Sequence, residues 1–293
     1  MQGAVGRWAE VGWVTLRALP QTLHGKDVAL RAAAVTFYGG IAVVPGIVLG
    51  VWVVGFVIGA DRVEALGDAL ADALPTAMGA PGAVTALVEA GTTLTSAAAF
   101  ACLFPASLYG EGLRRAFASL TGARENWIGW RGRLLFLPAV LAAPLPLFVL
   151  LLAAPTVSGL FAAESGGRVL GVMVAFLVDW ILVSAALIWA YRIVAPARAG
   201  WPAVIIGSFA AGSFVAGFVQ GFVLFLAIPV DLGVPFGGFD HVGAAVAVGL
   251  WLYLLHLIVL VGYAATLRFD QALDDRPDGR RVSAAARPGT GRP

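Results

Sequence analysis

Long apolar runs separated by short polar segments dominate the pattern of this chain. The six runs cover approximately residues 32–60, 93–110, 134–158, 169–191, 203–226 and 243–265. A bilayer core needs about 20 consecutive apolar residues in a helix. The pattern therefore predicts an all-α polytopic membrane bundle with six transmembrane helices. The second run is the weakest, because it is short and rich in Ala, Ser and Thr.

The distribution of basic residues between the runs predicts the orientation. Of the 19 lysines and arginines, only Arg62 and Arg168 fall in the three loops that follow the first, third and fifth runs. The others occupy the N-terminal segment, the two remaining loops and the C-terminal tail. Basic residues favour the cytoplasmic side. We therefore expect a cell-membrane protein with its N- and C-termini in the cytoplasm.

The segments outside the runs predict three further features. Residues 61–92 place leucines at helical spacing (Leu66, Leu70 and Leu74) before a Pro/Gly-rich turn, which indicates an extracytoplasmic helical hairpin. This hairpin serves as a lid or docking surface, or simply as a solvated connector. Residues 1–30 contain a predicted interfacial helix, the transmembrane domain spans 31–268, and the charged, Pro/Gly-rich tail 269–293 is expected to be disordered.

Composition excludes a soluble domain. Hydrophobic residues make up 60% of the 293 residues, charged residues 12%, and mean hydropathy is +0.89. The net charge of +2 is divided among loops, so we expect no nucleic acid partner. Cys102 is the only cysteine, and the three histidines (His24, His241 and His256) are far apart in sequence. With no catalytic motif either, we expect no enzymatic activity, no metal site and no cofactor.

Ionisable and amide side chains inside apolar runs are costly, so they mark candidate functional positions. Asp179 lies near the middle of the fourth run, and His256 lies at a similar depth in the sixth. We hypothesise that the two line a polar cavity and exchange a proton. The alternative is a structural hydrogen bond between packed helices. Gln220 in the fifth run is predicted to be an interhelical tether or a substrate contact.

The cytoplasmic end of the second run is a candidate inner gate formed by Tyr109, Glu111, Arg114 and Arg115. The alternative is a set of ion pairs at i, i+3 and i, i+4 on one helix face. Prolines interrupt several runs, as expected for a conduit or for packing kinks. The glycine pairs 46/50, 55/59 and 217/221 fit close helix approach, either within the bundle or in a homo-oligomer.

Four segments in this order resemble the virulence factor BrkB family, also called the YihY family, of bacterial inner-membrane proteins. They are Arg31–Tyr38 leading to Pro45, Leu108–Phe117, Trp189–Pro196 followed by Trp201 and Gly207, and Leu250–Leu255 through Gly262. One departure is Tyr263, where the family usually has an acidic residue. The resemblance implies a six-helix membrane fold and little about mechanism.

Two functions remain open at this point. The first is a transporter or a protein that handles lipid or envelope components, with membrane lipids as partners and a small molecule or lipid as substrate. Asp179, His256, the interrupted runs and the outer hairpin favour it. The second is a structural or assembly factor of the cell envelope, in which the polar residues only hold the bundle together.

Overall fold

The structure, a computed structural model, describes residues 2–74, 79–123, 130–142, 149, 165–226, 228 and 232–274. This part of the chain forms helices and turns and contains no strand, which confirms the all-α class. The helices are α1 (Gln2–Leu23), α2 (Val28–Ile58), α3 (Ala60–Ala73), α4 (Ala80–Thr92), α5 (Ser96–Thr121), α6 (Trp130–Ala142), α8 (Ser165–Trp189), the π-helix η2 (Ala190–Val194), α9 (Trp201–Leu226), the short 3₁₀ helix η3 (Val234–Phe236) and α10 (Asp240–Asp274).

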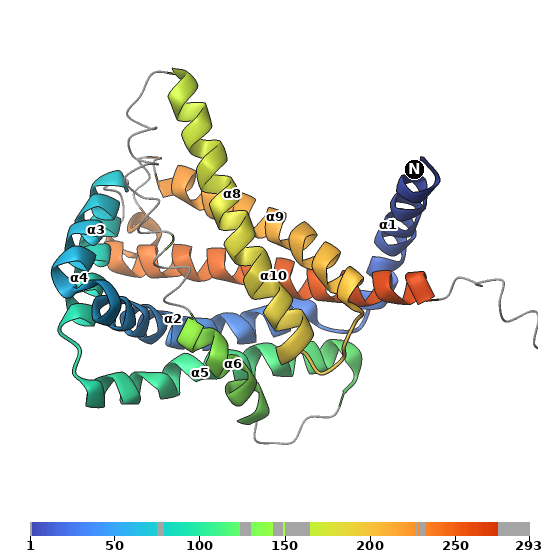
Figure 1. Cartoon of the computed structure of the whole chain (residues 1–293), viewed down its shortest axis with the longest axis horizontal. Coiled ribbons are helices and arrows are strands. Elements are labelled where there is room, and N and C mark those ends of the chain that lie inside the picture. The colour runs from blue at the N-terminus through green and yellow to red at the C-terminus, as the bar shows by residue number, and fades with distance from the viewer. Residues whose placement is uncertain are drawn as a thin grey trace, which may run out of the picture.

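The helices pack in a continuous order around α2 and α10. Helix α2 packs against α5 and α10, α5 carries α6, and α10 packs against α9, which in turn contacts α8. Figure 1 shows α2, α5 and α10 running along the long dimension, with α8 crossing them. Helices α3 and α4 lie at one end, whereas α1 and the end of α10 lie at the other.

Four helical segments in the described part of the chain are long and apolar enough to cross a membrane. They are Val28–Ile58, Val169–Val194, Trp201–Phe222 and Asp240–Asp274, and they correspond to the first, fourth, fifth and sixth predicted spans. The second predicted span lies in α5, whose C-terminal half is charged and which is not among the four. The third begins in α6, and most of its remainder lies outside the described residues.

The predicted hairpin is present as α3 and α4, which pack against each other and against α2. Gly59 separates α2 from α3 with φ of 92°, a conformation that strongly favours glycine. Val63 of α3 and Val88 of α4 are buried against Val51 and Val54 of α2. The hairpin therefore rests on the bundle through a small apolar contact of its own.

Both ends of the described chain are more helical than predicted. Helix α1 extends to Leu23 and includes Pro20. Helix α10 continues to Asp274, six residues past the predicted end of the membrane domain at 268. Its last turns have polar contacts, because Arg268 donates to Thr22 Oγ1 and Asp270 accepts from the Gly200 amide. Residues 275–293 of the predicted disordered tail lie outside the described residues.

Candidate functional site

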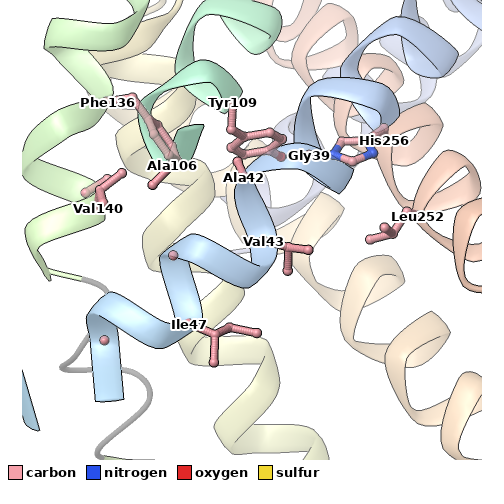
Figure 2. A pocket seen from close by; sticks show the side chains of 13 residues that line it. Gly39, Ala42, Val43, Ile47, Ala106, Tyr109, Phe136, Val140, Leu252 and His256 are labelled. Atoms are coloured by element: carbon pink, nitrogen blue, oxygen red, sulfur yellow. Dashed lines mark hydrogen bonds between the residues drawn. The ribbon is translucent and has the colours of Figure 1, made fainter. Parts of the chain in front are cut away.

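An apolar cavity of about 310 Å³ lies between α2, α5, α6 and α10 (Figure 2). Small residues of α2, including Gly39, Ala42 and Gly46, face it at helical spacing. A Cβ atom added at Gly46 would meet no atom within 4 Å. Gly46 therefore leaves space instead of allowing the close helix approach expected from the Gly46/Gly50 pair. The only ionisable groups that line the cavity in the described chain are Tyr109 and His256.

His256 lies at the polar end of this cavity and bonds to two other helices. Its Nδ1 is 3.0 Å from Thr36 Oγ1, and its Nε2 is 3.1 Å from the Tyr109 hydroxyl. Thr36 uses its own hydroxyl proton on the Ala32 carbonyl oxygen. In the tautomer with its proton on Nδ1, the imidazole donates to Thr36 and accepts the Tyr109 proton at Nε2. This arrangement satisfies His256 and joins α10 to α2 and α5.

Asp179 is held elsewhere, by Gln220. Gln220 Nε2 donates to Asp179 Oδ2 at 2.7 Å, which links α8 to α9 as an interhelical tether. The hypothesis of an Asp179–His256 pair is not supported, because each residue bonds to different helices. The two residues lie at similar depths on their helices, but depth along a helix does not determine which neighbour a side chain faces. In the structure, Asp179 and His256 thus belong to two separate sets of hydrogen bonds.

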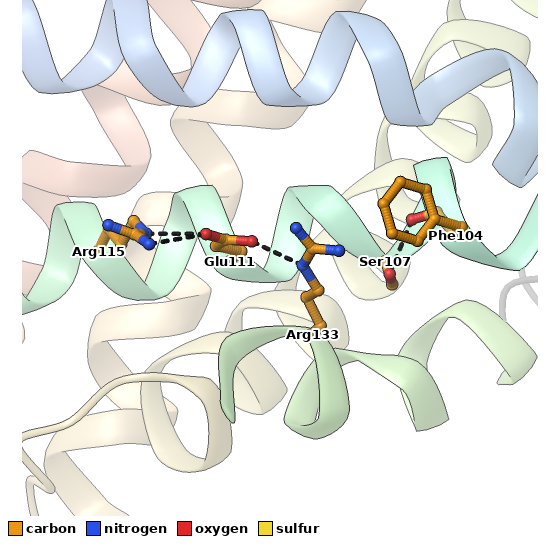
Figure 3. A network of polar contacts seen from close by, with 5 residues as sticks. All are labelled: Phe104, Ser107, Glu111, Arg115 and Arg133. Carbon is orange, nitrogen blue, oxygen red and sulfur yellow. Dashed lines mark hydrogen bonds and ion pairs between the residues drawn. The ribbon is translucent and has the colours of Figure 1, made fainter. Parts of the chain in front are cut away.

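Glu111 is the centre of an ion-pair cluster between α5 and α6 (Figure 3). Arg115, one turn further along α5, lies 2.8 Å from Glu111 Oε1 through its Nη2. Arg133 of α6 donates from Nε to Glu111 Oε2 at 2.6 Å. The guanidinium of Arg133 also lies 4.9 Å from the centre of the Phe104 ring, close enough for a cation–π contact. The Glu111–Arg115 pair was predicted, but the part played by Arg133 was not.

The ion pairs set the pKa of Glu111, which lies just past the predicted span 93–110. Burial of the carboxyl raises its pKa, but the hydrogen bonds and charges of Arg133 and Arg115 lower it more. The net effect is a pKa below the ordinary value for glutamate. Glu111 is therefore ionised near neutral pH, and this cluster of one acid and two arginines carries one net positive charge.

The two glycines beside Glu111 allow the close packing on which the cluster depends. A Cβ atom at Gly110 would lie 2.5 Å from the Gly132 carbonyl oxygen of α6. A Cβ atom at Gly112 would lie 2.5 Å from the Tyr38 ring of α2. Real Cβ atoms do not come this close, so only glycine fits at either position. The Tyr-Gly-Glu-Gly segment thus brings three helices together around one carboxylate.

Arg114 does not belong to the Glu111 cluster, although it was predicted as part of the same gate. Its Nη1 donates to the Val194 carbonyl oxygen at 2.6 Å. Val194 is the last residue of η2, where the chain of α8 widens into a π-turn. The predicted gate residues thus have three separate roles. Tyr109 bonds His256, Glu111 pairs with Arg115, and Arg114 holds the end of η2.

Tyr263, the departure from the usual family pattern, is completely buried beside this π-turn. Its hydroxyl donates to the Ala197 carbonyl oxygen at 2.9 Å. Its ring centre lies 4.3 Å from Phe117 and 5.5 Å from Tyr191. Tyr191 in turn donates its hydroxyl to the Val259 carbonyl oxygen of α10. The tyrosine therefore supports the break after α8 with a neutral hydrogen bond.

Nothing in the described part of the chain gathers metal ligands. No group of three or more His, Cys, Asp or Glu side chains there is placed to hold a metal ion. Cys102 is a half-buried free thiol on α5. Its neighbours belong to a small apolar cluster around Leu49 and Ala99, so it acts as a packing residue.

Together these features indicate the class of protein to which the chain belongs. Long apolar helices with few ionisable groups are typical of a polytopic helical membrane protein. A family model described as virulence factor BrkB matches residues 19–287. The chain belongs to this family, as its four motifs indicated. No match was found among curated proteins or among solved structures.

Proposed function

We propose that this protein is a six-span component of the bacterial cell membrane, with both termini in the cytoplasm, that binds a lipid-like substrate in the α2–α5–α6–α10 cavity and moves it through the membrane. The observation that carries the proposal is the cavity itself. Its volume of about 310 Å³ lies at the lower end of the range of small-molecule sites. Glycine and alanine keep this space open where larger residues would fill it.

The lining of the cavity favours a hydrocarbon group over a polar solute. Val43, Ile47, Val140 and Leu252 supply apolar side chains around the space. His256, the polar residue at the end of the cavity, already bonds to Thr36 and Tyr109. A polar substrate would lose its hydration here and gain few new partners. An acyl or prenyl chain loses nothing comparable when it enters.

A cavity-filling variant tests this proposal. Gly46→Leu extends a side chain into the cavity, whereas Gly40→Leu on the same helix is a matched control. Gly40 is exposed, and a Cβ atom there also meets nothing within 4 Å. The purified proteins are reconstituted in phosphatidylethanolamine–phosphatidylglycerol vesicles that contain a phosphatidylglycerol with an NBD-labelled acyl chain. Dithionite then reports how fast the label moves between leaflets.

The wild-type protein and Gly40→Leu should accelerate movement of the label, and Gly46→Leu should abolish the acceleration. A diazirine-bearing phospholipid should crosslink to residues lining the cavity in the wild type and not in Gly46→Leu. Crosslinks at the cavity without movement of the label would support lipid binding but contradict lipid transport. Equal behaviour of all three proteins, or no crosslink at the cavity, would overturn the proposal.

The second candidate is a structural or assembly factor of the cell envelope. The observation that favours it is the number of polar groups used only to join helices, such as Asp179 with Gln220 and Glu111 with Arg133. A stable complex with an envelope-synthesis protein that survives Gly46→Leu, without movement of lipid by the wild type, would support this second function over the first.

A further inference from the structure

A second pocket, of about 320 Å³, lies on the other side of α6 from the apolar cavity. It opens between the start of α6, the segment that follows η2, and Arg114 of α5. Trp130, Arg131 and Leu134 line it from α6, and Arg198 lines it from the segment after η2. The apolar cavity uses Phe136, Ala139 and Val140 of the same helix. The two spaces are therefore separate sites.

Three arginines surround this pocket, and no acidic residue lines it in the part of the chain that the structure describes. Arg114 is held in place by its bond to the Val194 carbonyl oxygen. Arg131 and Arg198 are exposed at the rim. Guanidinium groups bind phosphate oxygens through paired, charge-assisted hydrogen bonds. Arg131 and Arg198, at the rim of one concave space, form a site for an anion.

The described part of α6 supplies a second arginine to this pocket. Its first described turn contains Arg131 and Arg133 and no acidic residue. Glu111 pairs with Arg133, and Arg131 is the arginine of α6 that lines the pocket.

We propose that this pocket binds the phosphodiester of an anionic phospholipid headgroup. The rim carries exposed apolar side chains beside the arginines, because Trp130 is 51% and Leu134 is 55% exposed. Tryptophan is typical of the membrane interface, and basic pockets between helices bind acidic headgroups there. The glycerol and first acyl carbons would contact Trp130 and Leu134, and the phosphate would contact the arginines. With the proposed topology, this lipid belongs to the cytoplasmic leaflet.

The test measures binding of a short-chain lipid to the purified full-length protein in neutral detergent. Dioctanoyl-phosphatidylglycerol is titrated and the bound lipid is counted by native mass spectrometry. All variants carry Gly46→Leu as well, so that the apolar cavity does not contribute. Arg131→Gln with Arg198→Gln removes two rim charges. Arg17→Gln with Arg31→Gln is the matched control, because both of these arginines are also exposed and lie on the same predicted side.

The rim variant should bind dioctanoyl-phosphatidylglycerol about tenfold or more weakly, as expected from the loss of charge-assisted hydrogen bonds. The control pair should change binding less than about twofold. Dioctanoyl-phosphatidylcholine should bind weakly to every variant. Arg198→Glu alone should also weaken binding, and this single change in an exposed loop residue checks the result if the double variant fails to fold.

Equal weakening by both pairs of substitutions would overturn the proposal, since binding would then depend only on overall charge. Competition by millimolar inorganic phosphate would overturn the assignment to a lipid and indicate a site for free phosphate. Because the apolar cavity is filled in every variant, these outcomes do not depend on whether lipid moves through that cavity.

Discussion

Several polar side chains in the apolar helices of this protein are bonded to another helix. Asp179 is bonded by Gln220, and His256 by Thr36 and Tyr109. An unsatisfied polar group surrounded by hydrocarbon is costly, so these hydrogen bonds stabilise the packing of the helices. At the residue scale, the bundle is held by a few specific contacts between helices that otherwise present similar apolar surfaces.

Glu111→Gln tests the most charged of these contacts. The substitution keeps the shape of the side chain and removes the charge that pairs with Arg115 and Arg133. Both arginines are about a third exposed, so solvent weakens the pairs. We expect a loss of about 1–2 kcal/mol of stability at pH 7, measured as a lower Tm of the purified protein in detergent.

The difference between wild type and Glu111→Gln should depend on pH. The folded state lowers the pKa of Glu111 below its usual value, so the carboxylate stabilises the fold above the unfolded-state pKa, near 4.5. That contribution is lost as pH falls through the lowered pKa. The two Tm values should therefore converge as pH falls below about 4.5. A constant difference down to pH 3 would contradict a stabilising ion pair.

The sequence was a better guide to which polar residues form contacts than to the partners of those contacts. Glu111 and Arg115 are four residues apart, so helix geometry alone predicted their pair. Arg133 is 22 residues from Glu111, and its contact depends on how α5 crosses α6. The signal for that crossing was present in Gly110 and Gly132, which meet at the crossing point. Single glycines are too common to assign such a contact without a structure.

At the scale of elements, the break after α8 organises the largest buried cluster. The π-turn η2 places Tyr191 inside the bundle, where it packs with Phe117 and Tyr263. The same turn ends at Val194, whose carbonyl oxygen accepts from Arg114. A π-turn leaves an irregular backbone that needs additional hydrogen-bond donors. Arg114 supplies one for Val194, and Tyr263 supplies one for Ala197 in the segment that follows.

The α3–α4 hairpin depends on a smaller contact, which Val63→Ala should weaken. Val63 is completely buried against the valines of α2 and α4. Removing its two methyl groups should reduce local stability by about 1–3 kcal/mol. Hydrogen exchange should then become at least about fivefold faster in α3 and α4, with no change in α9. Val57→Ala, at a position of α2 that is 77% exposed, should leave both regions unchanged.

Faster exchange throughout the molecule in Val63→Ala would contradict a separate hairpin unit. The same result would indicate that the hairpin is a cooperative part of the bundle and would argue against a role as an independently moving lid.

The extent of each helix was predictable where the apolar run itself sets the length. Helices α2, α8 and α9 begin and end within a few residues of their predicted spans, apart from the π-turn η2, which follows α8. Helix α5 runs 11 residues past the predicted end at 110, to Thr121. There, apolar residues such as Leu113 and Phe117 are buried against other helices and alternate with arginines. Hydropathy alone underestimates such a helix, because protein contacts replace lipid on one face only.

At the scale of the whole molecule, the arrangement of the ends agrees with the distribution of charge. The acidic hairpin α3–α4 lies at one end, whereas α1 and the C-terminal end of α10, with Arg268, lie at the other (Figure 1). The arginine pocket lies between α5, α6 and the segment after η2, on the predicted cytoplasmic side. We propose that the first, fourth, fifth and sixth spans cross the membrane. The hairpin and the arginine pocket can then lie on opposite sides of it only if α5 and the segment starting at α6 also cross it.

Cysteine accessibility tests this requirement directly. Cys102→Ala removes the natural thiol, and single cysteines are then introduced by Ala86→Cys in α4 and Ala123→Cys after α5, both at exposed positions. A membrane-impermeant maleimide should label Ala86→Cys on intact spheroplasts. It should label Ala123→Cys only after the membrane is opened, because the positive-inside rule keeps the arginine-rich loop in the cytoplasm. Labelling of both positions from the same side would show that α5 does not cross the bilayer, and the number of spans would then be wrong.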